Sequence, residues 1–384
     1  MTNESEPSGG ISRLDTERLH VASQRQLIWW RFKRHRVALV ALVIVILYYL
    51  IALGAEFMST SDPREGRSAR ALVPPQPIHL FDNGSFSPHV CAIVGSRDLY
   101  TLEKTYEADC STKIGVRLFA QGFEYKFLGL IPANLHLIGV SDPETYRAEE
   151  SIFLIGTDTQ GRDLYSRTIY GTRTSMTIGL VGVTMSLIIG IVLGGISGFF
   201  GGVADNIIQR LIEIIRSIPT IPLWMGLAAA LPPDWGVTQI YFAITVIVSL
   251  FAWTGLARVV RGRFLAMREE DFVTAALVAG ATWQGIIFRH MVPSFYSHII
   301  ASATLAIPFM IISETALSFL GLGLRPPAIS WGVLLQATQN VQAIALTPWL
   351  MFPAVPVIVA ILALNFMGDG LRDAADPYSA VEAG

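Results

Sequence analysis

The sequence predicts an all-α polytopic membrane protein with six transmembrane helices and a small extracytoplasmic insertion that contains some β structure. Of its 384 residues, 52% are hydrophobic and 15% are charged, whereas soluble globular proteins carry about 25% charged residues. Six apolar stretches have close to the roughly 20 residues that a membrane span needs. One long segment of mixed composition, residues 56–172, separates the first stretch from the others.

The six candidate spans are residues 37–55, 174–204, 217–233, 235–257, 291–313 and 348–368. The third is the weakest by composition and is expected to begin earlier, near Ile207. Pro219 and Pro222 are expected to kink it, because proline removes a helical hydrogen bond and clashes with the preceding turn.

Arginine and lysine in the short flanks predict the orientation of the spans. They gather before the first span and between the fourth and fifth, at Arg31, Lys33, Arg34, Arg36, Arg258, Arg261, Arg263, Arg268 and Arg289. The short loops on the other side hold only Arg325. Both termini and the loop 258–290 are therefore expected in the cytoplasm. The expected segments are a cytoplasmic start (1–36), a first span (37–55), an extracytoplasmic insertion (56–172), a five-helix core (173–370) and a cytoplasmic tail (371–384).

The insertion is expected to be folded. Apolar residues recur at near-alternate positions from Val116 to Ile138, which is typical of short strands, whereas residues 59–88 are expected to form irregular loop. Both cysteines, Cys91 and Cys110, lie in this segment. A disulfide is plausible in an oxidising compartment, and two unpaired buried thiols are the alternative.

The second span carries small residues at intervals of four: Gly182, Ser186, Gly190, Gly194, Gly198 and Gly202. This spacing places them on one helix face, where another backbone can approach closely. We expect a packing seam, within the chain or between subunits.

Charged residues near or within the spans are candidates for a pathway or a gate. Glu213 lies three residues from both Arg210 and Arg216, so either arginine can pair with it along one helix face. A structural or gate-adjacent ion network is preferred here over a ligand site. Glu314 lies far along the fifth span, where a lone carboxylate is costly. It either faces a partner or a water-lined cavity, or it is hydrogen-bonded locally by the hydroxyls of Ser313, Thr315 or Ser318. Both alternatives remain open.

No motif for catalysis or cofactor binding is present. The sequence lacks GxxxxGK[ST], HExxH and GxSxG, and its seven histidines show no metal-ligand spacing. Its basic residues lie at membrane rims, which gives nucleic-acid binding no support. We therefore expect neither an enzyme nor a metal site.

Residues 271–293, DFVTAALVAGATWQGIIFRHMVP, form a short apolar stretch in the predicted cytoplasmic loop. Asp271 is a candidate N-cap and Gly280 suits the position after the helix, which gives a helix of about 12 Å. Thr282 is expected to cap a second helix that continues into the fifth span. The first helix must bury its apolar face on the membrane surface or in a groove on a partner. The small Ala275, Ala276 and Ala279 slightly favour the groove.

Thr274, Ala275, Ala276, Gly280 and Pro293 form a pattern, TAA-x3-G-x12-P, that resembles the EAA coupling loop of binding-protein-dependent ABC importer permeases. Residues 156–179, 314–335 and 365–377 look like the C-type subunit of the oligopeptide, dipeptide and nickel permease group. The resemblance covers roughly residues 25–55 and 150–378, and residues 56–150 are longer than expected for the group. Thr274 stands where the motif has glutamate, and His290 and Val292 stand where isoleucine and leucine are common.

The resemblance implies the type I ABC importer permease fold and a pore subunit of an ATP-driven importer in the bacterial inner membrane. Its implied partners are a second homologous permease subunit, two ATPase subunits or domains that hold ATP-Mg, an extracytoplasmic substrate-binding protein and membrane lipid. No cofactor is implied for this chain. The implied ATPase-coupling residues are Asp271, Phe272, Thr274, Ala275, Ala276 and Gly280.

Peptides are the favoured substrate, and the resemblance leaves nickel complexes and oligosaccharides open. The alternatives to an importer subunit are a secondary transporter driven by an ion gradient and a membrane-anchored binding module. Inverted repeats and broken helices at a midplane site, which are usual in secondary transporters, are not evident. Six spans also exceed what anchoring requires.

Overall fold

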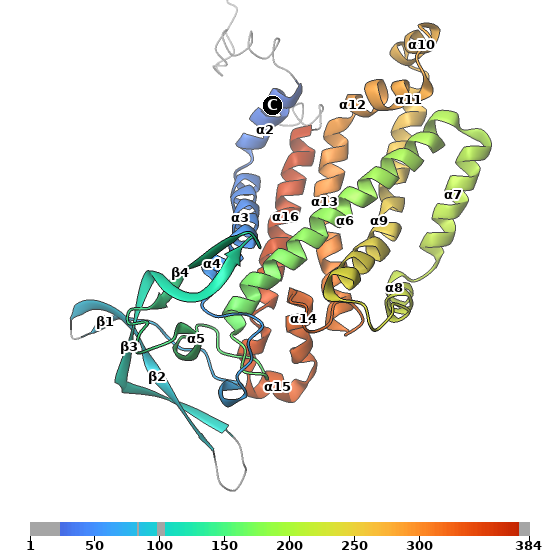
Figure 1. Ribbon diagram of the computed structural model, residues 1–384. Helices are drawn as coiled ribbons and strands as arrows, with labels where there is room; N and C mark the ends of the chain where they lie inside the picture. Colours follow the sequence, from blue (N-terminus) through green and yellow to red (C-terminus); the bar gives the residue numbers. More distant parts are fainter. Residues whose placement is uncertain (1–23, 83, 98–103, 376–384) are drawn as a thin grey trace, which may run out of the picture.

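The computed structural model describes residues 24–82, 84–97 and 104–375. It consists of a bundle of long helices with a β-sheet lobe at its side (Figure 1). The long helices are α2 (Gln24–Arg34), α3 (Arg36–Leu53), α6 (Leu164–Phe200), α7 (Gly202–Ser217), α8 (Thr220–Ala229), α9 (Val237–Met267), α13 (Tyr296–Phe319) and α16 (Ala354–Ala375). The predicted tail residues 376–384 and the start 1–23 lie outside the described residues.

Shorter elements join them: α4 (Ala55–Met58), η1 (Ser68–Arg70), α5 (Ala148–Ser151), α10 (Asp271–Val278), α11 (Trp283–Gly285), η2 (Ile286–Met291), α12 (Val292–Ser294), α14 (Trp331–Leu335), η3 (Gln336–Gln339), α15 (Val341–Leu346) and η4 (Pro348–Met351). The strands are β1 (His79–Asp82), β2 (Ser85–Arg97), β3 (Lys104–Phe127) and β4 (Ile131–Val140).

Five helices of the described residues are long and apolar enough to cross a membrane, and a sixth span is possible if α7 and α8 count as one. These two helices are bent by 86° where Ile218 and Pro219 separate them. The kink expected at the prolines is therefore confirmed, and the earlier start expected near Ile207 falls within α7, but the expected end at residue 233 lies beyond the end of α8. Helix α7 belongs to the same broken unit and α8 ends at Ala229.

Helix α6 begins at Leu164, ten residues before the start expected at residue 174. Its first turns contain polar residues, so a prediction based on apolar stretches does not include them. The carboxylate of Asp163 caps the helix by accepting a hydrogen bond from the Ser166 amide at 2.8 Å. The hydroxyls of Thr168 and Thr172 donate to the carbonyl oxygens four residues earlier, which satisfies polar side chains within a buried helix.

The fifth span differs as well: α13 covers Tyr296–Phe319 rather than residues 291–313. Helix α9 continues to Met267, ten residues past the expected end at 257. The last candidate span runs from Pro348 to Ala375, seven residues further than expected. Apolar stretches locate each helix, but helices continue into polar sequence wherever backbone hydrogen bonds and packing continue.

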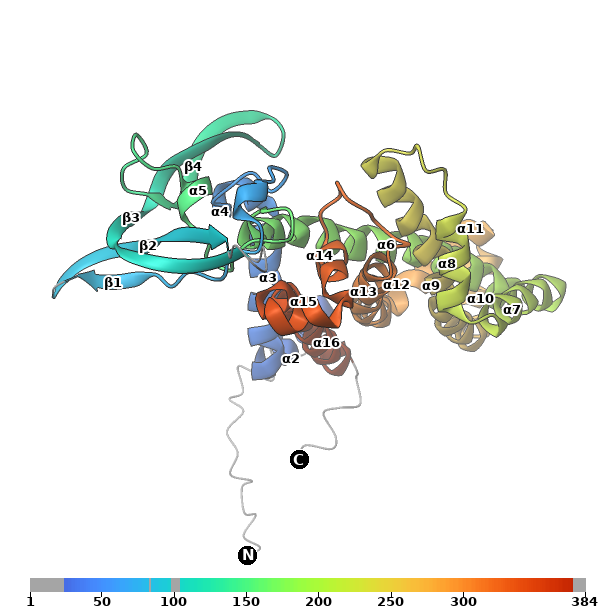
Figure 2. The ribbon, with the colours of Figure 1, turned by 90° about the horizontal axis from the view of Figure 1, so that it is seen from below.

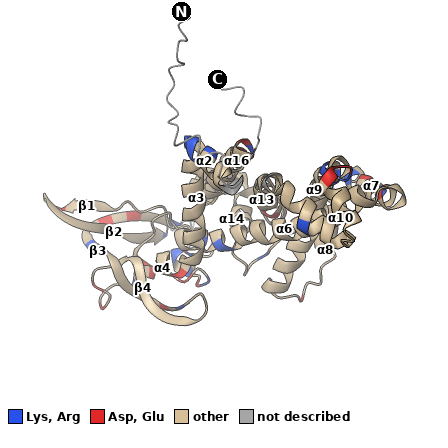
Figure 3. Ribbon diagram, turned by 90° about the horizontal axis from the view of Figure 1, so that it is seen from above, with Lys and Arg blue, Asp and Glu red and all other residues tan. Residues whose placement is uncertain are grey.

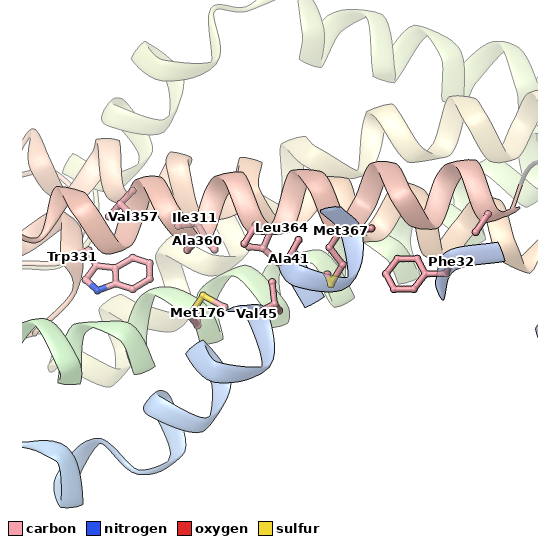
Figure 4. Packing of buried hydrophobic residues seen from close by; sticks show 13 residues of the cluster. Phe32, Ala41, Val45, Met176, Ile311, Trp331, Val357, Ala360, Leu364 and Met367 are labelled. Carbon is pink, nitrogen blue, oxygen red and sulfur yellow. The ribbon is translucent and has the colours of Figure 1, made fainter. Parts of the chain in front are cut away.

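The largest buried cluster joins α2, α3, α6, α13, α14 and α16. Figure 4 shows its side chains, with Phe32 of α2 against the end of α16 and Trp331 of α14 at the other end. The labelled members are Phe32, Ala41, Val45, Met176, Ile311, Trp331, Val357, Ala360, Leu364 and Met367. This cluster holds the first and last spans together across more than 300 residues of sequence.

The four strands form one antiparallel sheet in the order β1-β2-β3-β4. Figure 2 shows it as a lobe on the side of the bundle away from α7 and α8. The expected short strands near residues 116–138 correspond to β3 and β4. The expectation of irregular loop over residues 59–88 is wrong in part, because β1 and the start of β2 lie there. Their alternating residues are mostly exposed, so no apolar pattern marks them.

Helices α2 and α10 and the last residues of α16 lie at one end of the bundle (Figure 1). Helices α14 and α15 lie at the opposite end, and the sheet reaches beyond α4 toward that end. The buried Glu56 joins short α4 to α6, because it pairs with Arg173 through two oxygen to nitrogen contacts of 2.6 Å. The neighbouring Phe57 of α4 contacts Phe119 of β3, so α4 connects the sheet lobe to the bundle.

Candidate functional site

The short helix α10 projects from the end of the bundle between α9 and α11 (Figure 1). It contains Asp271–Val278, and its N-cap is Glu270 rather than the expected Asp271. Gly280 follows with a φ of +79°, a left-handed conformation that glycine adopts without strain. The expected helix and glycine corner are thus present, shifted by one residue at the start.

The second helix of the segment begins as expected and then differs. The Thr282 hydroxyl accepts a hydrogen bond from the Gly285 amide at 3.3 Å and caps α11. The chain then forms a π-helical stretch, η2, followed by α12 and a break at Phe295 before α13 begins. A single continuous helix from Trp283 into the fifth span was therefore a wrong expectation. π-Helical stretches are rare in proteins, and those that occur often lie at functional sites.

One fully buried side chain, with the half-buried Ala276 beside it, anchors α10 to the rest of the molecule. Val273 is fully buried and packs in a cluster formed by the end of α9, by η2 and by the start of α13. The cluster contains Val260, Phe264, Met267, Val273, Ile286, Ile287, Met291, Phe295 and Ile299. Because these residues come from both flanking spans, α10 is packed against α9 and α13 and is not held by loops alone.

Other positions of α10 expose apolar side chains. Val278 is 85% exposed, Leu277 is 51% exposed and Phe272 is 37% exposed. Of the two alanines, Ala275 is exposed, whereas Ala276 is half-buried against the anchoring cluster. Apolar groups that a helix leaves exposed outside the membrane spans are typical of a binding surface.

Thr274 occupies the position of the usual motif glutamate. Its hydroxyl donates to the Glu270 carbonyl oxygen at 3.4 Å, within its own helix. The threonine therefore does not offer the charge that a glutamate would. Glu269, Glu270 and Asp271 supply exposed carboxylates at the start of the same helix.

In Figure 3, charged residues lie near α2, α7 and α9 at this end of the bundle, and also on the sheet lobe and near α4. Arg261 of α9 pairs with Asp205 of α7, with Nε to Oδ1 at 2.5 Å and Nη2 to Oδ2 at 2.6 Å. The Ser197 hydroxyl of α6 donates to Asp205 Oδ1. One carboxylate thus joins α6, α7 and α9. Sequence reasoning missed this pair because its members lie 56 residues apart.

Three predicted glycines form the contact between α6 and α9. A Cβ at Gly194 would lie 2.5 Å from the Ala257 carbonyl oxygen, and one at Gly198 would lie 2.5 Å from Phe264 Cβ. A Cβ at Gly190 would lie 3.0 Å from Leu256. Within this chain, therefore, the three glycines line a helix seam.

Gly202 does not share in this seam, contrary to the prediction. It lies at the corner between α6 and α7 with a φ of +54°, and a Cβ built there meets no heavy atom within 4 Å. Gly202 fits the four-residue spacing of the sequence, but α6 ends at Phe200, so Gly202 does not lie on the same helix face.

The predicted ion network on α7 is small. Arg210 Nη1 donates to Glu213 Oε2 at 2.7 Å, and both side chains are exposed. Among the described residues, no ion pair joins Arg216 to Glu213. A gate role for these three residues stays a prediction.

Glu314 is fully buried in α13 and is surrounded by serine hydroxyls. Its Oε1 accepts hydrogen bonds from Ser318 and Ser330 at 2.8 Å, and its Oε2 accepts from Ser175 at 3.4 Å. Of the hydroxyls named from the sequence, Ser318 contacts it and Ser313 instead donates to the Phe309 carbonyl oxygen. The network joins α6, α13 and α14, and the distant Ser175 and Ser330 carry no sequence signal that links them to Glu314.

Cys91 and Cys110 lie with their sulfur atoms 2.00 Å apart, as a disulfide between β2 and β3. The register of the two strands shifts at this point, from Cys91 opposite Lys113 to Ala92 opposite Asp109. The disulfide therefore fixes a bulge of β3. His79 lies near both sulfurs, with the three ligand-type atoms within 4.8 Å of one another, but disulfide sulfurs are not thiolate ligands.

Comparison with known proteins adds the family. Residues 190–379 match the model of the binding-protein-dependent transport system inner membrane component, and residues 23–75 match the N-terminal TM domain of oligopeptide transport permease C. The chain is 40% identical to the oligopeptide transport system permease protein OppC of Haemophilus influenzae, over 59% of this chain and 71% of that protein. It is 37% identical to OppC of Bacillus subtilis, over 58% of this chain and 70% of that protein.

A dipeptide transport system permease protein, DppC of Bacillus subtilis, is 37% identical over 58% of this chain and 68% of that protein. Among solved structures, an inward-facing MetNI methionine ABC transporter chain matches with a TM-score of 0.44 and 17% identity, over 55% of this chain and 97% of that chain. The curated relatives are named as permeases and not as enzymes, and nothing in these matches supports an ion-driven carrier. The chain belongs to the family of inner membrane components of binding-protein-dependent transport systems.

Proposed function

We propose that this permease subunit forms, with a second homologous permease subunit, the membrane pathway of an importer for peptides. Two ATPase subunits or domains that bind ATP-Mg drive it, and an extracytoplasmic binding protein delivers the substrate. The substrate class rests on the relatives, which are named as oligopeptide and dipeptide permeases.

The observation that carries the proposal is the construction of α10. It is anchored to both flanking spans through Val273, and it exposes Phe272, Leu277 and Val278 at the end of the bundle. An apolar helix of this kind fits a groove on a partner protein. We assign that groove to the ATPase subunit.

The orientation follows from the same arrangement. Helices α2 and α10 and the end of α16 share one end of the bundle, which also carries the arginine-rich flanks, so we place this end in the cytoplasm (Figure 1). The sheet lobe within residues 56–172 is then extracytoplasmic, where an oxidising environment preserves the disulfide.

ATP binding acts on the pathway through α10. When the ATPases close, α10 moves with the groove, and the cluster around Val273 transmits this movement to α9 and α13. The seam of Gly190, Gly194 and Gly198 makes α6 follow α9. ATP thus favours one of two arrangements of the spans, because the ATPases contact α10 differently in the two states.

Replacing Val278 by aspartate tests the docking. Val278 is the most exposed apolar residue of α10, so Val278→Asp leaves the packing of this chain intact and places a charge in the proposed groove. We expect at least a tenfold loss of co-purified ATPase, since burying an unpaired charge costs more than about 1.4 kcal/mol. The ATPase retained on the purified permease is measured at equal permease amounts.

Leu130→Asp serves as the matched control, because Leu130 is 82% exposed in the turn between β3 and β4. It should retain the ATPase fully. Full retention by Val278→Asp would contradict the docking of α10. Ala276→Asp is a poorer test, because Ala276 also packs against the anchoring cluster.

A further inference from the structure

An apolar groove of about 440 Å³ runs along the outside of the bundle between α3 and α16. It opens outward, since Val40 and Leu362 on its rims are 61% and 49% exposed. Apart from Arg36 at one end, every lining residue is apolar. They are Val37, Val40, Ala41 and Ile44 of α3 with Val359, Leu362, Ala363 and Phe366 of α16.

Small residues create the groove. Ala41 and Ala363 are buried at its floor, where the two helices approach each other, while larger side chains form its rims. From Val37 to Ile44 an α-helix rises about 10 Å. A flexible hydrocarbon chain fits such a groove, because the groove is apolar and faces outward along its length.

The end of the groove is basic. Arg36 is the first residue of the α3 span, and Lys33, Arg34 and Arg36 are all exposed. Trp29 is 45% exposed in α2, with the Lys33 ammonium 5.1 Å from its ring centre. Exposed tryptophan and cations at the end of a span are typical of the level of lipid headgroups.

His35 and the acids of α16 complete the surroundings. The His35 Nδ1 accepts a hydrogen bond from the Ala38 amide at 3.2 Å and caps α3. Asp369 is exposed one turn beyond Phe366, so the α16 side of the opening carries a negative charge. The same end of α16 also carries Arg372 and Asp373, and Arg36 is the one charged residue among the described residues that line the groove, so the charge nearest the groove is positive and lies on the α3 side.

We propose that this groove is a binding site for one anionic phospholipid, with an acyl chain between α3 and α16 and the headgroup phosphate at Arg36. Charge complementarity at Arg36 selects the headgroup, and the apolar lining of the groove accommodates the chain. The bound lipid fills the outer surface of the pair formed by the first and last spans, which Figure 4 shows packed along their other faces.

Native mass spectrometry of the full-length chain, extracted with its partner subunits and then exposed to phosphatidylglycerol or phosphatidylcholine, tests the proposal. We expect one phosphatidylglycerol to be retained in preference to phosphatidylcholine. Arg36→Gln should weaken that retention about fivefold, the effect of one cation at a lipid surface. Val40→Trp should abolish it by filling the groove.

Two matched controls change similar side chains elsewhere. Arg258→Gln removes an exposed arginine of α9, and Val246→Trp enlarges an exposed apolar residue of the same helix. Both should keep the bound lipid. Equal retention of the two lipids, or equal loss in variants and controls, would overturn the proposal.

A further measurement distinguishes lipid from protein on this face. Both cysteines of the sequence are joined in the disulfide, so Val40→Cys introduces one free thiol. Efficient crosslinking of this thiol to another subunit would overturn the proposal, because a protein would then cover the groove. We expect no such crosslink and protection of the thiol by phosphatidylglycerol.

Discussion

Helix α10 and the sheet lobe both project from the bundle, and they are attached in opposite ways. The cluster that anchors α10 is made of residues from α9, η2 and α13, so it is part of the bundle itself. The sheet has its own small cluster of Val90, Ile114, Val116, Val140, Ala148 and Ile152, and a disulfide. Ion pairs of Glu56 with Arg173 and of Asp158 with Arg167 link the segment that precedes α6 to that helix.

The difference indicates two kinds of projection. A movement of α10 must displace the ends of α9 and α13, because they share one packed core with it, and packed cores do not deform gradually. The sheet is stabilised internally, and the bundle can rearrange without unfolding it. Under the proposed function, α10 transmits the movement of the ATPases to the bundle, and the sheet lobe keeps its shape.

The largest effect is expected from Val273→Asp, which removes the anchor of α10. A buried charge without a partner costs at least about 3 kcal/mol and displaces the helix from its cluster. Coupled uptake should fall by more than about a hundredfold, while insertion into the membrane continues. Transport into vesicles measures this. Val273→Leu is the apolar control, and uptake near wild type in Val273→Asp would contradict the anchoring role.

The sheet should respond to loss of its disulfide without affecting α10. The bridge joins residues 19 apart, so Cys91→Ser with Cys110→Ser should destabilise the lobe by about 3 kcal/mol. Protease cleavage within residues 79–140 should then accelerate on the order of a hundredfold. Retention of the ATPase should stay unchanged. A loss of ATPase in this variant would show that the two projections are coupled.

The glycine seam extends the comparison into the bundle. Gly194→Ala forces α6 away from the Ala257 carbonyl oxygen and should cost about 1–3 kcal/mol of stability, together with part of the coupled uptake. Gly262→Ala is its control on α9, because a Cβ there meets no atom within 4 Å. The control should be neutral or stabilise by up to about 1 kcal/mol. Thermal unfolding of both variants compares them, and equal behaviour would contradict the seam.

The smallest effect concerns pH and the junction between the lobe and α6. Burial raises the pKa of the Asp163 carboxyl above its ordinary value. The folded chain therefore holds this proton more tightly than the unfolded chain. Its contribution to stability decreases as the pH rises from the ordinary pKa to the raised one, and is constant above it.

Asp163→Asn should remove this decrease, because an amide neither binds nor releases a proton in this range. Unfolding midpoints over a pH series measure the change. Asp142→Asn is the control: the hydrogen bonds from Thr145 lower the pKa of the exposed Asp142, so that carboxyl contributes the opposite slope. An unaltered slope in Asp163→Asn would contradict the assignment.

Much of the bundle and of α10 follows from local sequence. Apolar stretches located the spans, and the polar residues around Asp271–Val278 with Gly280 located the short helix. The start of α6 was missed because Thr168 and Thr172 satisfy their hydroxyls inside the helix, which hydropathy does not reveal.

Contacts between distant residues could not be predicted from one sequence. Asp205 pairs with Arg261, and Ser330 approaches Glu314, because of how the helices pack. Neither residue type nor sequence spacing predicts these contacts. The anchor at Val273 was hidden for the same reason, since nothing in the apolar stretch DFVTAALV distinguishes its one buried residue.

Crosslinking from the exposed face of α10 tests the central claim most directly. Val278→Cys introduces a free thiol into a chain whose two cysteines form the disulfide, and Leu130→Cys places an equally exposed thiol on the sheet lobe. In intact membranes we predict that a short bifunctional reagent joins residue 278, and not residue 130, to the ATPase subunit. Crosslinking of residue 130 alone, or of neither, would contradict the assignment of α10 as the ATPase-coupling helix.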